Sequence, residues 1–337
     1  MAENGKRGRH GCLWAAIFLM LLVAGCGVLI VIGLFVVKRS GEHTVWRHGK
    51  GADEYPALNE IWAEGGGHTK VVRIPLRGMI MLGGEDGFFG AHAGSADLAL
   101  RAIQRATQDT EVKAVIMDID SGGGGITASD ILYKALVDFK AEQDGRVVVA
   151  LLNDVAASGA YYVALAADHI VAHPTTITGS IGVLVQSLSF RELAQKIGVK
   201  DVTIKSGENK DILNPFNELT PEQRRMMQGI VDELYGRFVS LVAENRELSE
   251  EKVRSFADGS IFTAKSAIEL GLVDEIGYWK DALAQTRKML KVDDVRVYRY
   301  EEEMSLSSLF KSADSRNPMS ALLQPFTHTR LMYLWQM

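Results

Sequence analysis

Cysteine is almost absent from this chain of 337 residues, and the two cysteines that occur, Cys12 and Cys26, lie near its start. Everything after Val37 therefore lacks thiols, which excludes a disulfide framework, a cysteine nucleophile and a cysteine-ligated metal from that part of the chain. An excess of positive charge is also absent, because the net charge is −5. The composition therefore predicts no general attraction for nucleic acid.

Charged residues are missing from residues 13–37. A helix of this length would extend about 37 Å, enough to cross the roughly 30 Å hydrocarbon core of a bilayer with some tilt. We predict an uncleaved transmembrane helix here, and basic residues on both sides leave its orientation open. The alternative is a lipoprotein cleavage box at residues 23–26 with Cys26 as the lipidated N-terminus. However, the residues after Cys26 stay apolar, whereas a processed lipoprotein usually continues into a polar tether.

Phosphate-binding motifs are missing as well. The glycine-rich turn at residues 121–125 is not followed by Gly-Lys-Ser/Thr, and no Gly-x-Gly-x-x-Gly lies in a dinucleotide-binding unit. The turn is therefore not typical of a nucleotide cradle.

Short runs rich in valine and isoleucine alternate with segments of helical periodicity after residue 69. The runs predict buried parallel strands at residues 70–76, 112–120, 146–152, 168–172 and 199–204. The helical spacing predicts helices at residues 96–107, 128–141, 158–167, 222–246, 249–257 and 264–270. This order predicts an α/β core with right-handed crossovers, followed by a mostly helical C-terminal part.

Two turns of small residues follow predicted strands, where ligands gather in an α/β core. One is the glycine turn after Asp120, and the other contains Ser158. Ser158 fits a helix N-cap. It also fits a nucleophile lifted to the end of a strand, beside a helix N-terminus that favours negative charge. In that second interpretation, glycine N–H groups of the first turn would stabilise an oxyanion while Ser158 attacks a carbonyl.

A serine nucleophile needs a base, and the residues alone leave two kinds open. His173 follows Ser158 by one predicted helix and one strand, and aspartates are plentiful. A lysine base would have to lose its proton near neutral pH, well below the reference pKa of about 10.4, through burial or positive neighbours. His169 and His173 lie about 13 Å apart on a predicted strand, too far to share a metal ion. We predict no metal and no cofactor.

Four motifs together resemble a known family. They are the glycine turn after Asp120, Ala-Ala-Ser-Gly-Ala-Tyr-Tyr at 156–162, Thr-Gly-Ser-Ile-Gly-Val at 178–183 and Lys-Ser-Gly-Glu-Asn-Lys-Asp-Ile at 205–212. In order and spacing they resemble the serine peptidases of the signal peptide peptidase A family in its short, single-module form, over about residues 70–290. The resemblance implies the fold of caseinolytic proteases and crotonases, a spiral of ββα units.

The resemblance also implies roles for the matching residues. Ser158 matches the nucleophile, Lys210 the general base, and Ser180 the serine that helps to hold the lysine. Gly123 and Gly124 match the turn that supplies the oxyanion N–H groups.

One departure and one groove segment complete the predicted site. Gly122 stands where the family commonly has proline, which leaves the choice of oxyanion N–H open by one residue. The apolar segment after Ser180 fits a substrate groove that pairs with a peptide as an added strand, although a plain core strand fits it as well. This segment consists of Gly182, Val183, Leu184 and Val185.

The predicted organisation runs from a membrane anchor to a peptidase domain. It comprises an N-terminal tail at 1–12, the transmembrane helix at 13–37, a tether at 38–68, a Ser/Lys peptidase domain at 69–300 and a C-terminal tail at 301–337. Members of the family form rings whose sites take serine and lysine from neighbouring subunits. They sit on the outer side of the bacterial cytoplasmic membrane and digest remnant signal peptides.

The resemblance therefore predicts a membrane-anchored homo-oligomer that degrades signal-peptide remnants and other unfolded apolar peptides, with no nucleic-acid partner. Two alternatives stay open. One is a caseinolytic-type Ser/His/Asp peptidase that uses His173, and the other is a catalytically idle, ring-forming scaffold that binds peptides.

Overall fold

The computed structural model describes residues 58–83, 86–87, 90–91, 94–302 and 332–334. The predicted transmembrane helix at 13–37 lies outside these residues, as do most of the predicted tether and most of the predicted C-terminal tail. Among the helices of the described residues, none combines the length and the apolar character needed to cross a membrane.

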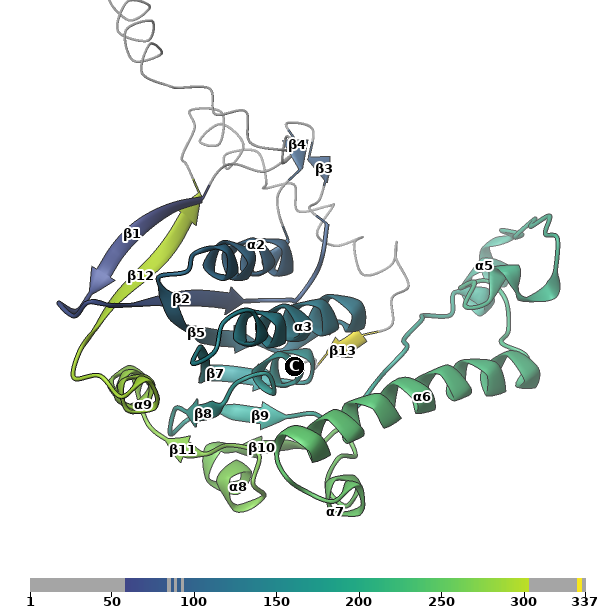
Figure 1. Cartoon of the computed structure of the whole chain (residues 1–337). Coiled ribbons are helices and arrows are strands. Elements are labelled where there is room, and N and C mark those ends of the chain that lie inside the picture. Colours follow the sequence, from purple (N-terminus) through teal and green to yellow (C-terminus); the bar gives the residue numbers. More distant parts are fainter. Residues whose placement is uncertain (1–57, 84–85, 88–89, 92–93, 303–331, 335–337) are drawn as a thin grey trace, which may run out of the picture. The chain divides into compact units, whose positions relative to one another are not determined.

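Strands and helices alternate through the described part of the chain (Figure 1). The strands are β1 Leu58–Glu64, β2 Thr69–Arg77, β3 Asp86–Gly87, β4 Gly90–Ala91, β5 Val112–Ser121, β6 Gly123–Gly125, β7 Val147–Ala157, β8 His169–Ala172, β9 Ile177–Gly179, β10 Ile261–Thr263, β11 Glu275–Ile276, β12 Val295–Glu302 and β13 Met332–Leu334. The helices are α2 Ser95–Gln108, α3 Ile126–Glu142, α4 Gly159–Ala164, α5 Arg191–Ile197, α6 Pro221–Asn245, α7 Glu250–Arg254, α8 Ala264–Glu269 and α9 Trp279–Leu290, with a 3₁₀ helix η2 at Glu208–Asp211.

A largely parallel sheet forms the centre of the fold, with the strand order β1-β12-β2-β5-β7-β8-β11. Neighbours from β12 to β11 are parallel, and β1 is antiparallel to β12. A parallel strand that is covered on both faces needs an almost continuous apolar sequence. β5 has one, since Val115 and Met117 face one buried cluster while Ala114 and Ile116 face another.

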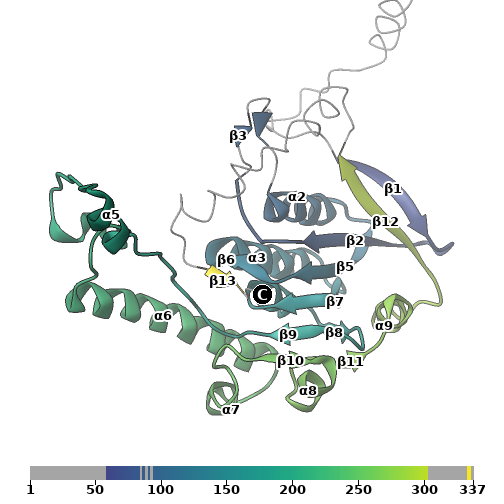
Figure 2. The same ribbon diagram turned by 180° about the vertical axis from the view of Figure 1, so that it is seen from behind.

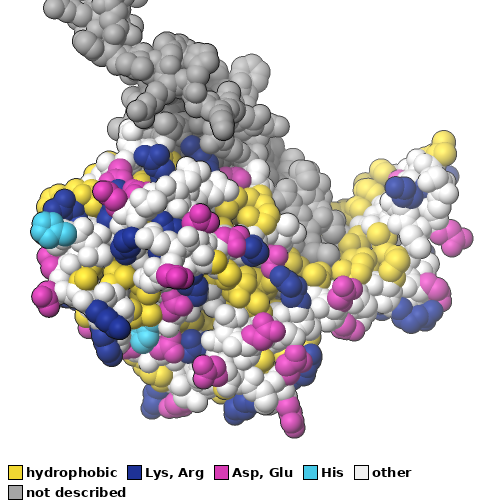
Figure 3. Space-filling model, in the orientation of Figure 1, with side chains coloured by type: hydrophobic (Ala, Val, Ile, Leu, Met, Phe, Trp, Pro, Cys, Tyr) yellow, Lys and Arg dark blue, Asp and Glu magenta, His cyan; other side chains and the backbone are white. Residues whose placement is uncertain are grey.

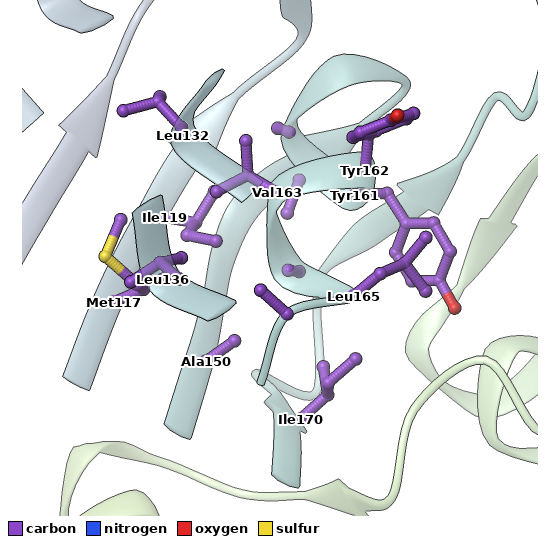
Figure 4. Close-up of a cluster of buried hydrophobic side chains, with 14 of the residues drawn as sticks. Met117, Ile119, Leu132, Leu136, Ala150, Tyr161, Tyr162, Val163, Leu165 and Ile170 are labelled. Carbon is purple, nitrogen blue, oxygen red and sulfur yellow. The ribbon is translucent and has the colours of Figure 1, made fainter. Parts of the chain in front are cut away.

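Helices cover both faces of this sheet. α2, α3 and α4 pack on the face that carries the larger hydrophobic cluster, and α9 packs on the other (Figure 1 and Figure 2). All six residues of α4 are buried, so this short helix lies inside the core rather than on its surface. Figure 4 shows Tyr161, Val163 and Leu165 among side chains from the strands and from α3.

Strand β7 changes partner along its length. Its first half pairs with β8, as Leu152 opposite Ala172, and its last three residues pair with β9, as Ala157 opposite Gly179. At the change, the Asn153 amide donates to the Asp118 carboxylate at 2.5 Å. The first half of β7 therefore lies beside β8 in the core, and its last residues extend past the end of β8 and lie beside β9.

The residues from 182 to 230, here called the arm, are largely exposed. Only Ala194 and Gln223 are buried within it, and α6 sinks into the core only from Phe238 onward. Several apolar side chains of the arm are more than half exposed, including Val202 at 84% and Ile204 at 99%. Hydrophobic side chains (yellow) appear along this part of the chain in Figure 3. A contiguous apolar surface of this kind marks an interaction surface.

Most predicted elements of the core are present, and two predictions need correction. Residues 199–204 are not a strand but an irregular segment of the arm, because their apolar side chains are not buried within this chain. Residues 58–64, predicted as part of the tether, form β1, which pairs with β12 from the other end of the domain. The mixed α/β class and the helical character of the C-terminal part agree with the prediction.

Candidate active site

Ser158 occupies a strained turn between β7 and α4. Its φ of 56° and ψ of −122° are costly for a residue with a Cβ, by about 1–3 kcal/mol. Its N–H donates to the carbonyl of Gly179 at 2.7 Å, and its carbonyl accepts from the N–H of Tyr162 at 2.9 Å. Ser158 is the N-cap residue of α4 by position, but its side chain makes no capping hydrogen bond. A strained strand-to-helix turn that holds a serine is the geometry of a nucleophile elbow.

Ser180 stands beside Ser158 at the end of the neighbouring strand. Because Ala157 of β7 pairs with Gly179 of β9, each serine is the next residue beyond its strand, and parallel neighbours lie about 4.8 Å apart. Ser180 also has a positive φ, 51°, and its N–H donates to the Ser260 carbonyl at 2.7 Å. The two serines, 22 positions apart in sequence, therefore share one edge of the sheet.

The glycine turn lies at the same edge. Ser121, the last residue of β5, pairs with Ala156, two residues before Ser158. Gly123 has a φ of 98°, and a Cβ on Gly124 would lie 2.2 Å from the Ile80 carbonyl oxygen. Both positions therefore require glycine, one for its backbone angle and the other for a close approach of two chains.

The backbone groups of β6 are divided between two sides. The Gly123 N–H donates to the Ser121 hydroxyl at 3.1 Å, while the Gly123 carbonyl and the Gly125 N–H bond to Ile80. Polar groups of successive strand residues alternate between the two edges, so the N–H and C=O of Gly124 face the opposite edge. Of the two predicted oxyanion donors, Gly124 is thus the one whose N–H is directed away from Ile80.

The helix after Ser158 is anchored by both of its tyrosines. Tyr161 donates to the Leu272 carbonyl at 2.7 Å, and burial raises the pKa of Tyr161. Tyr162 donates to Asp130 of α3 at 2.6 Å, and Arg237 of α6 bonds to both groups. Burial opposes the charge of Asp130, but the hydrogen bonds from Arg237 and Tyr162 lower its pKa below the usual value. These bonds join three helices and hold α4, and with it the turn at Ser158, in place.

Sequence reasoning missed two features of this site. Asp130 and Arg237 carry no local signal, because each is an ordinary charged residue of an amphipathic helix and they are 107 positions apart. Gly159 begins α4, and the first N–H groups of a helix have no partner within it. The N–H of the residue directly after a nucleophile at a strand-to-helix turn commonly contributes to the oxyanion hole, so the position of Gly159 after Ser158 was a signal in the sequence for this role.

Lys210 lies on the arm, in η2, and is exposed. Both views show α5 and the beginning of α6, which flank η2 in the sequence, away from β7 and β9 (Figure 1 and Figure 2). Within the described residues, Lys210 makes one hydrogen bond, from its backbone N–H to the Gly207 carbonyl at 3.1 Å. The turn that carries Lys210 is held by its neighbours: Lys205 bonds to the Asp211 carboxylate at 2.6 Å, and this bond lowers the pKa of Asp211. Lys205 is therefore engaged in an ion pair within the arm.

His173 is displaced from Ser158 along the sheet. It follows the end of β8, level with Asn153 of β7, which is five residues before Ser158. Between Leu152 and Ala156, β7 bulges, since these four steps lie opposite only two steps of β5, and Ser158 lies beyond this bulge. Its Nδ1 bonds to the Thr175 hydroxyl at 2.8 Å, and its ring lies edge-on to Tyr278. The register therefore argues against a base role for His173 towards Ser158 of the same chain.

The segment predicted to line the groove, residues 182–185, begins two residues after Ser180. It is half-buried, and Leu184 takes part in a single β-bridge. Its position next to Ser180 keeps the groove prediction open. In the part of the chain that the structure covers, no three histidine, aspartate or glutamate side chains gather to hold a metal ion.

Comparison with known proteins defines the family. Residues 140–293 match peptidase family S49. A protein of Enterococcus faecium named as a signal peptide peptidase SppA is 36% identical over 244 residues, which are 72% of this chain and 70% of that protein. The chain belongs to the signal peptide peptidase A family, S49. The resemblance seen in the four motifs is thereby confirmed.

Two further proteins are similar to this chain. A Synechocystis protein named as a protease is 37% identical over 249 residues, 73% of this chain and 84% of that protein. A solved structure of a mutant membrane-bound stomatin-specific protease, 1510-N, matches 66% of this chain and 86% of its own at 16% identity, with a TM-score of 0.42. As an S49 peptidase, the protein is a serine-type protease.

Proposed function

We propose that this S49 peptidase is a Ser/Lys endopeptidase in which Ser158 is the nucleophile and Lys210 the general base. The observation that carries the proposal is the strained turn at Ser158. The Ser158 side chain makes no capping hydrogen bond, and the turn lies beside Ser180 and beside the strand β6 that contains Gly124. Strained backbone angles of this kind cluster at active sites, and here Ser158 and Ser180, which lie side by side, both have a positive φ. The idle scaffold is disfavoured because a peptide-binding role alone needs no such turn.

In the proposed reaction the Ser158 hydroxyl oxygen bonds to the carbonyl carbon of the substrate while its proton passes to the neutral amine of Lys210. The N–H groups of Gly124 and Gly159 stabilise the oxyanion. The C–N bond then breaks, and Lys210 returns the proton to the leaving amine. Water hydrolyses the acyl-enzyme by the same route, and the Ser180 hydroxyl accepts a hydrogen bond that orients the lysine.

The lysine is proposed to come from a neighbouring subunit. Lys210 sits on an exposed arm whose apolar side chains include Val202 and Ile204, and such a surface is typical of a subunit interface. Docking of one arm against the next subunit would bury these side chains and complete each site. The exposed arm supports a homo-oligomeric ring. For the domain we propose the caseinolytic protease/crotonase-like arrangement of ββα units, and the succession β5-β6-α3 is one such unit.

An acyl probe tests the proposed nucleophile. When the full chain is treated with a serine-reactive fluorophosphonate and digested, the adduct is expected on the peptide that contains Ser158. The variant Ser158→Ala should remain unlabelled, whereas Ser187→Ala, a change at an exposed arm serine, should label as the parent does. An adduct on another serine, or none, would contradict the proposal.

The proposed substrates are remnant signal peptides and other unfolded apolar peptides, met at the outer side of a bacterial cytoplasmic membrane. The uncharged residues 13–37 support an anchor that holds the peptidase beside that membrane. The full chain is expected to stay with membranes through high salt and alkaline carbonate, and to keep its N-terminal residues. Release by carbonate, or mass spectrometry showing Cys26 as a lipidated N-terminus, would overturn the uncleaved anchor.

A further inference from the structure

The lysine proposed as the base has acidic neighbours in its own turn. η2 has the sequence Glu-Asn-Lys-Asp, so Glu208 lies two residues before Lys210 and Asp211 directly after it. A carboxylate close to a lysine favours the charged form of the amine. A general base must instead be neutral when it takes the proton of Ser158. The turn therefore contains charges that oppose the role proposed for Lys210.

Lys205 forms an ion pair with the carboxylate that directly follows Lys210. The Lys205 Nζ donates to one oxygen of Asp211 at 2.6 Å and to the Glu208 carbonyl at 3.3 Å. The Asn217 amide donates to the other oxygen of Asp211 at 3.1 Å. The hydrogen bond from Lys205 lowers the pKa of Asp211, so this carboxylate is charged and paired at neutral pH. Both of its oxygens have partners, whereas the Lys210 side chain has none among the described residues.

The other acidic groups of the arm are bound by other partners or exposed to water. Asp201 accepts from the Thr203 hydroxyl at 2.9 Å and from the Asn214 amide at 3.0 Å, and the Asn217 amide lies between Asp201 and Asp211. Asp201 is thus held by neutral donors, and Asp211 by a cation. The remaining charged side chains from α5 to the start of α6 are the pairs Arg191–Glu218 and Arg225–Glu222 and the exposed Glu192, Lys196, Lys200, Glu208 and Arg224.

We propose that Lys205 is a positioning residue for the catalytic lysine, because it neutralises Asp211 and so prevents this carboxylate from holding Lys210 in its charged form. The inference rests on the proposed function of Lys210. Successive residues of a helical turn do not face each other, so Asp211 acts on Lys210 through its charge rather than through a hydrogen bond. At a separation of roughly 10 Å and an effective dielectric constant of about 20, one charge moves a titration by about one pH unit.

Charge variants of the pair test the proposal through the pH dependence of kcat/KM with an unfolded peptide. Lys205→Met leaves Asp211 without its cation, and the midpoint of the acid limb is expected to rise by about one pH unit. Activity below the midpoint should then fall about tenfold, while the plateau at high pH stays close to that of the parent. Lys205→Arg, which keeps the charge, should keep the parent midpoint. Lys265→Met, at an exposed lysine of α8 outside the arm, is the matched control and should leave the profile unchanged.

Removal of the opposite charge separates this effect from a loss of structure. Asp211→Asn leaves Lys205 without its counterion, so the midpoint is expected to fall below that of the parent. The double variant of Lys205→Met and Asp211→Asn should return the midpoint close to the parent value. A merely structural role of Lys205 would lower the plateau in every variant and leave the midpoint in place, and that result would overturn the proposal.

A second measurement does not depend on turnover. In the Ser158→Ala chain, Lys210 is acetylated with acetic anhydride across a range of pH, and the modified peptide is quantified by mass spectrometry. Because only the neutral amine reacts, the onset of acetylation at Lys210 should rise by about one pH unit with Lys205→Met and stay in place with Lys265→Met. An unchanged onset and an unchanged midpoint beside an inactive Lys210→Ala would end this inference and leave the proposed function standing. An active Lys210→Ala would instead remove the proposed base itself.

Discussion

The variants Ser158→Ala and Lys210→Ala are each expected to lose peptide hydrolysis almost completely, by about 10⁴- to 10⁶-fold in kcat. One removes the atom that bonds to the substrate and the other the group that takes its proton. Alanine at position 158 should fold normally, because the Ser158 side chain makes no capping bond and the turn is built by backbone bonds to Gly179 and Tyr162. Steady-state kinetics with an unfolded peptide, beside circular dichroism of each variant, measure both effects.

Two variants serve as matched controls. His173→Ala is expected to keep much of the activity, because the register displaces His173 from Ser158. Lys205→Ala should lose only part of it, because Lys205 supports the turn of Lys210 through its bond to Asp211. The double variant of Ser158 and Lys210 should be no worse than either single one, since residues of one catalytic unit fail together. An inactive His173→Ala with an active Lys210→Ala would reverse the assignment of the base.

Activity is expected to return when two inactive proteins are mixed. If each site takes Ser158 from one subunit and Lys210 from the next, mixing Ser158→Ala with Lys210→Ala subunits restores sites that hold both residues. In a ring of head-to-tail contacts with random exchange, equal mixing rebuilds about a quarter of the sites. The mixture should cleave unfolded apolar peptides and leave folded globular proteins intact.

The control for mixing combines Ser158→Ala with a subunit that carries both substitutions, which should recover nothing. Exchange itself is measured by energy transfer between labelled subunits. Absence of recovery despite demonstrated exchange would place serine and lysine in the same chain. The arm would then have to bring Lys210 to its own Ser158, and the exposed apolar side chains at 202 and 204 would need another explanation.

The sheet and its helices could be predicted from sequence where burial decides the pattern. β5 and α3 are recognisable because their apolar residues face a core inside the same chain. The predicted strand at residues 199–204 was wrong, since an apolar run in the sequence does not show whether this chain or a partner buries it. β1 was missed because its partner, β12, lies more than 230 positions away and none of its own residues is fully buried, so its sequence has no alternating pattern of apolar residues.

The candidate active site also has parts that the sequence predicts and parts that depend on contacts distant in sequence. Ser158 was predicted to follow a strand, but the place of Ser180 came from the family resemblance alone, because the strand before it, β9, has only three residues and was not predicted. The bond between Asp130 and Arg237 was not, as it depends on where α6 enters the core. The relation of Lys210 to Ser158 is the part that neither the sequence nor a single chain determines, because the arm packs so little against its own domain.

The division of β7 between two partners has a consequence for how this protein can change over evolutionary time. Substitutions in the half that pairs with β8 are selected against when they impair folding, since they alter buried side chains such as Val149 and Leu152. Substitutions in the half that pairs with β9 are also selected against when they lower catalytic activity, because they move Ser158 relative to its neighbours. Ala156 and Ala157 of this second half are also fully buried, so the catalytic end of β7 is constrained by folding and by turnover together, whereas the half beside β8 is constrained by folding alone.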